Sequence, residues 1–175
     1  MRIFASLATL ACLLSGCGGK ADNEIDLRNV DWSVYLGDSG RQHYTPLKQI
    51  NKENVNQLGV AWRYNSGEMR GTTSTMYTSP LVVDGVLYGL SPMLVAFALD
   101  AATGQEIWRH DPDVGGAAQR GLMYWRNDNE RRIYFTAANE LIALNAADGT
   151  PVMGFGDNGR VNLQPDRPGR RGYLG

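Results

Sequence analysis

The sequence is poor in the side chains from which most catalytic and metal centres are built. It has only two cysteines, Cys12 and Cys17, and two histidines, His43 and His110, which stand alone. No zinc-type spacing arises from them, and we interpret both histidines as surface or structural residues. Neither a glycine-rich phosphate loop nor a nucleophile elbow occurs. The common motifs of zinc enzymes, P-loop nucleotide-binding proteins and serine hydrolases are therefore missing.

Excess charge and long apolar runs are also lacking. Lys and Arg number 17 against 18 Asp and Glu, and this formal charge of −1 gives no general attraction to nucleic acid. Three arginines between residues 167 and 173 form a brief basic run, which we interpret as a solvated loop. Twenty-one glycines and few long periodic apolar stretches favour short strands joined by turns. The composition thus predicts an all-β fold.

The stretch 96–108 is the best-defined local pattern in the chain. It predicts a strand that ends near Leu99, a tight turn, and a return strand. Asp100 and Thr103 can hydrogen-bond the backbone of the turn, and Gly104 can adopt the positive φ that closes it. The small Ala98 leaves room for a neighbour to pack closely. The residues that define this motif are Ala98, Asp100, Thr103, Gly104 and Trp108.

The pattern returns further along the chain. Ala143 follows Ala98 by 45 residues and Met153 follows Trp108 by the same interval, while a weaker echo, Trp62, precedes Trp108 by 46. Asn145, Asp148 and Gly149 take the places of Asp100, Thr103 and Gly104. A period of 40 to 50 residues built from short strands is typical of propeller blades. The alternative is two ordinary hairpins that share common turn residues.

Two further strand pairs are expected. Asp84 and Gly85 predict a two-residue turn of the primed type within residues 79–90. Residues 120–125 and 132–136 form the next pair, joined by the polar stretch 127–130. That stretch lacks the ligand spacing and the closing Glu of a calcium loop, so we interpret it as a solvated hairpin tip.

The first residues are typical of a targeting segment. Arg2 and the apolar run 3–14 lead to a Leu-Ser-Gly-Cys sequence that ends at Cys17, and the run is too short to span a bilayer comfortably. This resembles a bacterial lipobox, with residues 1–16 as signal peptide, Cys17 as the lipidated anchor in the bilayer and 17–30 as a polar tether. An ordinary secretory signal or a buried helix is the alternative. With a lipobox, no cysteine remains for a disulfide.

The repeated motif resembles the tryptophan docking motif of quinoproteins, which also occurs in non-enzymatic propellers. The entry segment 31–58, followed by a Val-Ala-Trp strand that ends at Trp62, resembles dehydrogenases dependent on pyrroloquinoline quinone (PQQ). We expect Asn51 to cap one or two helical turns over 51–58. The resemblance implies a β-propeller, eight-bladed in the full-length family, of which residues 31–175 form the first two to three blades. The expected apolar anchors of the entry segment are Trp32, Tyr35, Tyr44, Leu47 and Ile50.

The same resemblance implies chemistry and site residues. In the family, PQQ takes a hydride from a hydroxyl group while an aspartate removes its proton and a calcium ion polarises the quinone. Arg120 matches a cofactor-contacting arginine, and Tyr77 stands where the family commonly has a cofactor-contacting glutamate. The vicinal cysteine pair of many alcohol-oxidising members is missing, which favours the glucose or sugar type. Calcium ligands and the catalytic aspartate are expected beyond residue 175.

These observations predict the N-terminal part of a quinoprotein dehydrogenase. We expect it to face the periplasm, anchored to a membrane, with Gly18 after Cys17 favouring the outer membrane. The complete protein would oxidise a sugar or alcohol and pass electrons to a membrane quinone or cytochrome c, whereas residues 1–175 alone would be inactive. The alternatives are a non-enzymatic propeller lipoprotein that acts as an assembly scaffold and a ligand-binding module that has lost catalysis.

Overall fold

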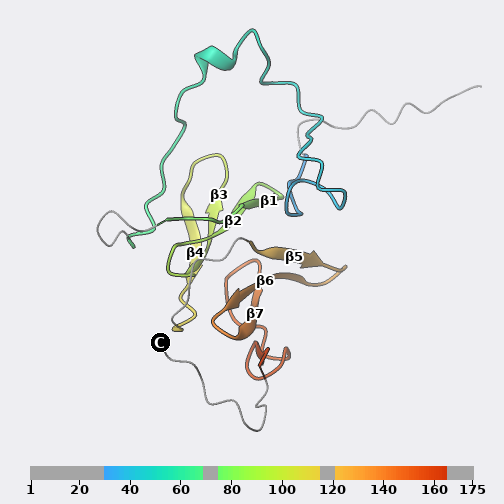
Figure 1. Ribbon diagram of the computed structural model, residues 1–175, viewed down its shortest axis with the longest axis vertical. Helices are drawn as coiled ribbons and strands as arrows, with labels where there is room; N and C mark the ends of the chain where they lie inside the picture. Colours follow the sequence, from blue (N-terminus) through green and yellow to red (C-terminus); the bar gives the residue numbers. More distant parts are fainter. Residues whose placement is uncertain (1–29, 69–74, 115–120, 165–175) are drawn as a thin grey trace, which may run out of the picture.

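The computed structural model describes residues 30–68, 75–114 and 121–164, which form two four-stranded antiparallel sheets (Figure 1). In each sheet the strands pair in chain order, so every strand lies beside its neighbours in sequence. The all-β fold expected from the sequence is confirmed. The first sheet contains β1 (Leu81–Val83), β2 (Val86–Leu90), β3 (Ala96–Asp100) and β4 (Glu106–His110), and the second contains β5 (Met123–Arg126), β6 (Arg131–Ala137), β7 (Glu140–Asn145) and β8 (Arg160–Asn162).

The predicted turns between the first strands of each sheet are present. Asp84 and Gly85 have φ angles of 50° and 77°, the positive values that a primed two-residue hairpin requires. Between β5 and β6 the side-chain oxygen of Asn127 accepts hydrogen bonds from the backbone N–H groups of Asn129 and Glu130. The stretch 127–130 is thus a self-bonded, exposed hairpin tip, as expected.

The second repeat departs from the first after its turn. Met153 was expected to occupy a return strand as Trp108 does, but it lies outside any strand and is 64% exposed. Pro151 makes an isolated bridge with Leu144, and the N–H of Val152 still donates to the carbonyl oxygen of Ala143 at 2.9 Å. The N–H of Phe155 then closes a turn onto the carbonyl oxygen of Val152 at 2.8 Å, which leads the chain away from β7. The chain then turns, and β8 pairs with β7 instead. The prediction for Met153 is therefore wrong.

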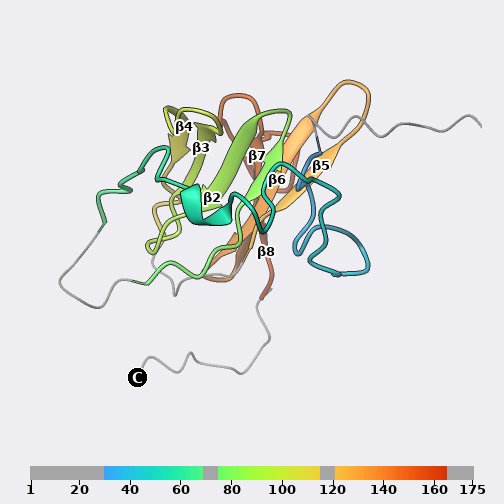
Figure 2. The same cartoon turned by 90° about the horizontal axis from the view of Figure 1, so that it is seen from above.

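The hydrophobic core lies between the two sheets, which stack face to face (Figure 2). Alternate residues of the strands point into it, as the two-residue period of a strand requires. In β6, for example, Ile133 and Phe135 are buried, whereas Arg132 and Tyr134 belong to the opposite face. The core side chains include Leu81, Val83, Tyr88, Leu90, Ala96, Ala98 and Trp108 from the first sheet and Leu122, Ile133, Phe135, Ala137, Ile142, Leu144 and Ala146 from the second and its flanks.

Residues 30–68 make a long excursion away from the sheets before returning to them (Figure 1). The excursion starts at Trp32, whose backbone pairs with Val82 through hydrogen bonds of 2.7 and 3.1 Å. It carries one short 3₁₀ helix, η1 (Val55–Gln57), so the predicted helical turn is present but brief. The side-chain oxygen of Asn51 accepts from the N–H of Glu53 rather than capping η1 directly.

The expected packing of the entry segment is wrong for four of its five apolar residues. Trp32 is partly buried, but the other four are exposed, because the hydrogen bonds of this segment are mostly local and no sheet covers it. Cys17 and the rest of residues 1–29 lie outside the described residues, so the lipobox stays a prediction. No helix within the described ranges is long and apolar enough to cross a membrane. The exposed residues are Tyr35, Tyr44, Leu47 and Ile50.

Candidate functional site

A tryptophan from the first sheet docks onto a turn of the second. The indole N–H of Trp108, in β4, donates a 2.9 Å hydrogen bond to the carbonyl oxygen of Ala146, at the end of β7. Its ring lies against Gly149 so closely that a Cβ atom there would stand 2.6 Å from the ring. The glycine predicted from turn geometry alone therefore has a second role: it makes room for the aromatic ring.

The same contact occurs one repeat earlier. The indole N–H of Trp62 donates to the carbonyl oxygen of Ala101 at 3.1 Å, and its ring lies 2.5 Å from the Cβ position of Gly104. Trp62 thus relates to the first sheet as Trp108 relates to the second. The weaker sequence repeat at Trp62 is therefore confirmed as a structural repeat.

The receiving turn is held by Asp100. One carboxylate oxygen of Asp100 accepts hydrogen bonds from the N–H of Ala102 at 3.0 Å and from the N–H and hydroxyl of Thr103, both at 2.8 Å. The Thr103 hydroxyl, followed by its N–H, lowers the pKa of Asp100 below its ordinary value. The N–H of Gly104, whose φ is 73°, closes the turn onto the carbonyl of Asp100 at 2.8 Å.

The second turn keeps this backbone with different side chains. The side-chain oxygen of Asn145 accepts from the N–H of Ala147 at 3.0 Å, and the N–H of Gly149 bonds the carbonyl of Asn145 at 2.9 Å. Asp148 accepts from both the N–H and the hydroxyl of Thr150, and the hydroxyl is the main cause of its lowered pKa. The two turns therefore share one backbone conformation. Their side-chain bonds differ, because Thr103 donates its hydroxyl back to Asp100, whereas Asp148 accepts from the hydroxyl of Thr150.

Two side chains from the first sheet converge on Ala146. Besides Trp108, the hydroxyl of Tyr88 donates to the same carbonyl oxygen at 3.3 Å. Burial in the core raises the pKa of Tyr88 to about 12, so the phenol stays protonated and can donate. Ala98 stands between Tyr88 and Trp108 in the strand register and is fully buried, as its small size predicted.

The starts of the first strands of the two sheets meet at the opposite end of the sheets from these turns. Ser79, just before β1, forms a parallel bridge with Gly121, just before β5. Tyr77, two residues before Ser79, is 60% exposed, and no hydrogen bond joins it to another described residue. Arg120 lies outside the described residues. The structure therefore shows only where Tyr77 lies, and the pairing of Tyr77 with Arg120 stays a prediction.

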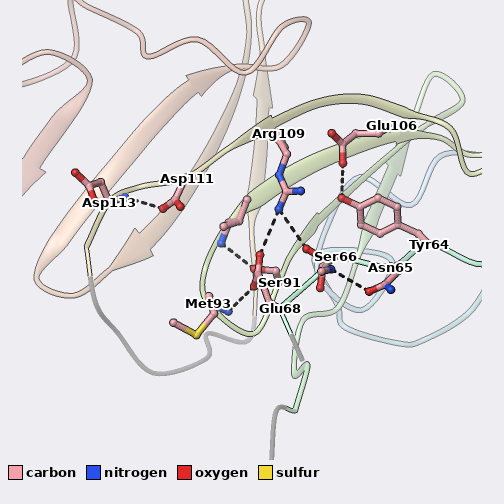
Figure 3. A network of polar contacts seen from close by, with 12 residues as sticks. Tyr64, Asn65, Ser66, Glu68, Ser91, Met93, Glu106, Arg109, Asp111 and Asp113 are labelled. Atoms are coloured by element: carbon pink, nitrogen blue, oxygen red, sulfur yellow. Dashed lines mark hydrogen bonds and ion pairs between the residues drawn. The ribbon is translucent and has the colours of Figure 1, made fainter. Parts of the chain in front are cut away.

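A polar cluster that the sequence did not reveal binds the end of the excursion to the first sheet (Figure 3). The carboxylate of Glu68 accepts from the N–H of Met93 at 3.0 Å and pairs with Arg109 at 3.4 Å. The hydroxyl of Tyr64 donates to Glu106, and burial followed by this bond raises the pKa of Tyr64 to about 12. These partners lie 25 to 42 residues apart in sequence, so no local pattern marks them.

This polar cluster borders an open pocket of about 510 Å³ that also contacts Asp111 and Asp113. Asp111 uses a carboxylate oxygen to accept from the N–H of Asp113. In the part of the chain that the structure describes, no three His, Cys, Asp or Glu side chains could together hold a metal ion. The cluster fixes the backbone near Met93 through the carboxylate of Glu68.

His110 ends β4 at the boundary between the sheets. Its side chain is half-buried, and its Nε2 atom has no hydrogen-bond partner. Burial, reinforced by the positive charge of Arg160, lowers the pKa of His110 below 6.5. Arg160 itself donates to the carbonyl of Pro112 at 2.9 Å and pairs with Glu140 at 2.8 Å. This arrangement favours the structural role expected for His110.

Comparison with known proteins gives a consistent family. A family profile described as "PQQ: Glucose/ethanol/alcohol dehydrogenase, beta-propeller domain" matches residues 32–173. The dehydrogenase subunit of alcohol dehydrogenase (quinone) from Gluconobacter oxydans (strain 621H) is 40% identical over 132 residues, which are 70% of this chain and 16% of that protein. Quinoprotein glucose dehydrogenase A from Acinetobacter calcoaceticus is 32% identical over 79% of this chain and 21% of its own length.

Solved structures agree with the sequence comparison. Quinohemoprotein alcohol dehydrogenase from Comamonas testosteroni superposes with a TM-score of 0.66 at 33% identity, over 82% of this chain and 20% of that structure. The enzyme ADHIIG from Pseudomonas putida HK5 gives a TM-score of 0.63 at 29% identity, over 80% of this chain and 20% of that structure. The chain thus spans about a fifth of the length of the relatives it matches.

Proposed function

Because this chain belongs to the PQQ-dependent glucose/ethanol/alcohol dehydrogenase family, we propose that it is the N-terminal part of an enzyme that oxidises a sugar or alcohol hydroxyl. Its two sheets are the first blades of a quinoprotein β-propeller. Relatives named for alcohol, glucose and glycerol support this substrate class. Within that class we favour a sugar of the glucose type.

The observation that carries the proposal is the parallel bridge between Ser79 and Gly121. It brings together the starts of the first strands of two blades, and Tyr77 lies two residues before Ser79. When bound, PQQ supplies the acceptor for the hydride. Tyr77 presents an exposed phenol that can donate one hydrogen bond or stack on a planar ring, and this fits a flat cofactor. We assign to Arg120 the pairing with a cofactor carboxylate or carbonyl oxygen.

The docked tryptophans support this arrangement indirectly. Trp108 fixes the second sheet against the first through Ala146 and Gly149, and so limits how far the ends of their first strands can separate. Cofactor enzymes depend on the protein mainly for position and electrostatic field. The calcium ligands and the catalytic aspartate belong, in this proposal, to parts of the protein beyond residue 175.

We further propose that residues 1–16 are a signal peptide and that lipid on Cys17 anchors the protein facing the periplasm, preferably at the outer membrane. The support is the lipobox pattern and the residue Gly18 that follows it. Electrons would pass to a membrane quinone or cytochrome c. Labelling with a radioactive or clickable fatty acid, with Cys17→Ser as the unlabelled control, tests the anchor.

The function is tested first on the native gene product. An antibody against residues 31–175 should detect a membrane band several times larger than 19.2 kDa. That product, supplied with PQQ and calcium, should reduce a dye in the presence of sugars or alcohols. Tyr77→Phe should weaken PQQ binding severalfold if the hydroxyl donates a hydrogen bond, and Tyr35→Phe, in the exposed entry segment, is the matched control.

Two results would overturn the proposal. A native band at 19.2 kDa would leave no complete propeller to catalyse the reaction. A full-length product that fails to bind PQQ in direct titration would instead favour the scaffold or binding-module alternative.

A further inference from the structure

The second sheet has an outer face, turned away from the first sheet, that carries large exposed side chains. Ile133 and Phe135 of β6 point into the core between the sheets, so the residues that alternate with them point the opposite way. On this face Met123 is 58% exposed and Trp125 is 39% exposed. The residues of the outer face on which the argument depends are Met123, Trp125, Arg132, Tyr134 and Ala143.

The strand register matches this outer face to the face of the first sheet that the second sheet covers. Tyr134, in β6, pairs with Met123 on one side and with Ala143 on the other. The residues that take these places in the first sheet, and are buried in the core between the sheets, are Tyr88, Leu81 and Ala98. The outer face therefore has the pattern of a covered blade face, while Met123 remains exposed where its counterpart is buried.

An aromatic ring lies beside the tyrosine on both faces. The ring centroids of Trp108 and Tyr88 are 6.1 Å apart, and those of Phe155 and Tyr134 are 5.4 Å apart. Phe155, rather than Met153, thus has the place beside the tyrosine that Trp108 has one repeat earlier. Because phenylalanine has no N–H, it cannot donate the hydrogen bond that Trp108 gives to the turn of the next sheet.

Tyr134 keeps a hydrogen-bond donor on the outer face. Its hydroxyl oxygen accepts from the guanidinium of Arg132 at 3.3 Å, so its own hydrogen is left to bond elsewhere. Among the residues that the structure describes, none accepts that hydrogen. One repeat earlier, the hydroxyl of Tyr88 donates to the carbonyl oxygen of Ala146, in the turn of the sheet that covers it. Tyr134 is therefore placed to make the same bond to the turn of a further sheet.

We propose that the outer face binds a third four-stranded sheet of the same protein, and that the hydroxyl of Tyr134 replaces an indole N–H as the donor to the turn of that sheet. This inference rests on the proposed function, because it takes the chain as the first part of a propeller. The occupant follows from the two repeats, in which a tryptophan docks onto the following sheet, and from relatives about five times as long as the matched region. The second junction then has one hydrogen-bond donor where the first has two.

Oxidation of Met123 by hydrogen peroxide tests whether the outer face is covered. The complete gene product is oxidised, and its peptides are quantified by mass spectrometry. Under a third sheet, Met123 should oxidise at least about tenfold more slowly in the native product than in the same product unfolded in urea. A side chain that stays 58% exposed should oxidise within about twofold of the unfolded rate, and that result would overturn the proposal. Protection that disappears on dilution would mean that a second copy covers the face, and would also overturn it.

Tyr134→Phe tests the donor, with the same oxidation of Met123 as the readout. Losing the hydroxyl should let the third sheet separate more often, so Met123 should oxidise about fivefold faster than in the parent. The bond from Arg132 is lost as well, but it lies within the second sheet and does not hold the sheets together. Tyr88→Phe, at the first junction, is the matched control and should leave Met123 oxidation within about 1.5-fold of the parent. Equal rates for Tyr134→Phe and the parent would contradict the role of Tyr134.

These measurements distinguish the failure of this inference from that of the proposed function. A product that binds PQQ while Met123 stays accessible would overturn the docking of a third sheet alone. A product that protects Met123 but fails to bind PQQ would overturn the dehydrogenase function and support the docking. A native product of only 19.2 kDa would overturn both.

Discussion

The ring of Trp108 lies over Gly149 with no room for a side chain: a Cβ atom on this glycine would stand 2.6 Å from the ring. Trp62 and Gly104 have the same relationship one repeat earlier. The contact therefore explains why a tryptophan and a glycine recur together although they act in different sheets. It also gives the most direct test of how the blades are held together.

Gly149→Ala should destabilise the protein by about 2–4 kcal/mol, because it combines a left-handed backbone with a steric clash against Trp108. The matched control is Gly85→Ala. Gly85 has a similar φ of 77° but open space around its Cβ position, so it should cost only about 1–2 kcal/mol. Urea denaturation of both variants measures the difference. Equal losses would mean that the ring contact contributes nothing.

Trp108→Phe should cost about 2 kcal/mol, and more than Trp62→Phe, because Trp108 is the more deeply buried of the two. The carbonyl of Ala146 still accepts from Tyr88 in this variant. Adding Tyr88→Phe removes both donors, so the double variant should lose more stability than the sum of the single variants. A double-mutant cycle by chemical denaturation checks this, and simple additivity would show that the shared carbonyl does not couple the two side chains.

Asp100→Asn should make the stability of the protein depend less steeply on pH in the acid range. The pKa of Asp100 is lower in the folded protein than its ordinary value of 3.8, chiefly through the Thr103 hydroxyl. Its contribution is therefore complete above pH 3.8 and is lost as the pH falls through the folded pKa. Thermal midpoints measured between about pH 6 and 2 should fall less steeply for Asp100→Asn than for the parent. Asp111→Asn, a carboxylate outside the docking turns, is the control.

His110→Gln should reduce the loss of stability at a higher pH than Asp100→Asn does, between about pH 8 and 5. The folded pKa of His110 lies below 6.5, so the folded state prefers the neutral ring. Stability is complete above pH 6.5 and is lost as the pH falls from there through the folded pKa, because the unfolded chain binds the proton more readily.

Midpoints between pH 8 and 5 should fall less for His110→Gln than for the parent. An NMR titration of His110 above 6.5 would contradict the prediction.

The local elements were largely predictable from sequence because their causes are local. The turn at Asp84 and Gly85 follows from two residues that tolerate positive φ. The turn from Asp100 to Gly104 follows from side chains that bond their own backbone. The spacing of Trp62, Trp108 and the two turns revealed the repeat, and with it the propeller.

Other features depended on contacts between distant residues. The same spacing suggested that Met153 would behave like Trp108, yet the chain turns after Val152, and β8, from residues further along, pairs with β7 instead. Tyr44 and Ile50 read as buried anchors because they are large and apolar, but burial requires a partner surface. A residue's hydrophobicity is set by the sequence, whereas its exposure is set by what packs against it.

By itself, then, the sequence determined the all-β class, the turns, the blade repeat and the family resemblance. Only the tertiary structure decided that Gly149 makes room for Trp108, that Tyr88 and Trp108 share one carbonyl, and that Ser79 meets Gly121. The physical reason is the range of the interactions. Hydrogen bonds within a turn act over a few residues of one chain segment, while docking and bridging join residues 38 to 58 positions apart that nothing in the local sequence brings together.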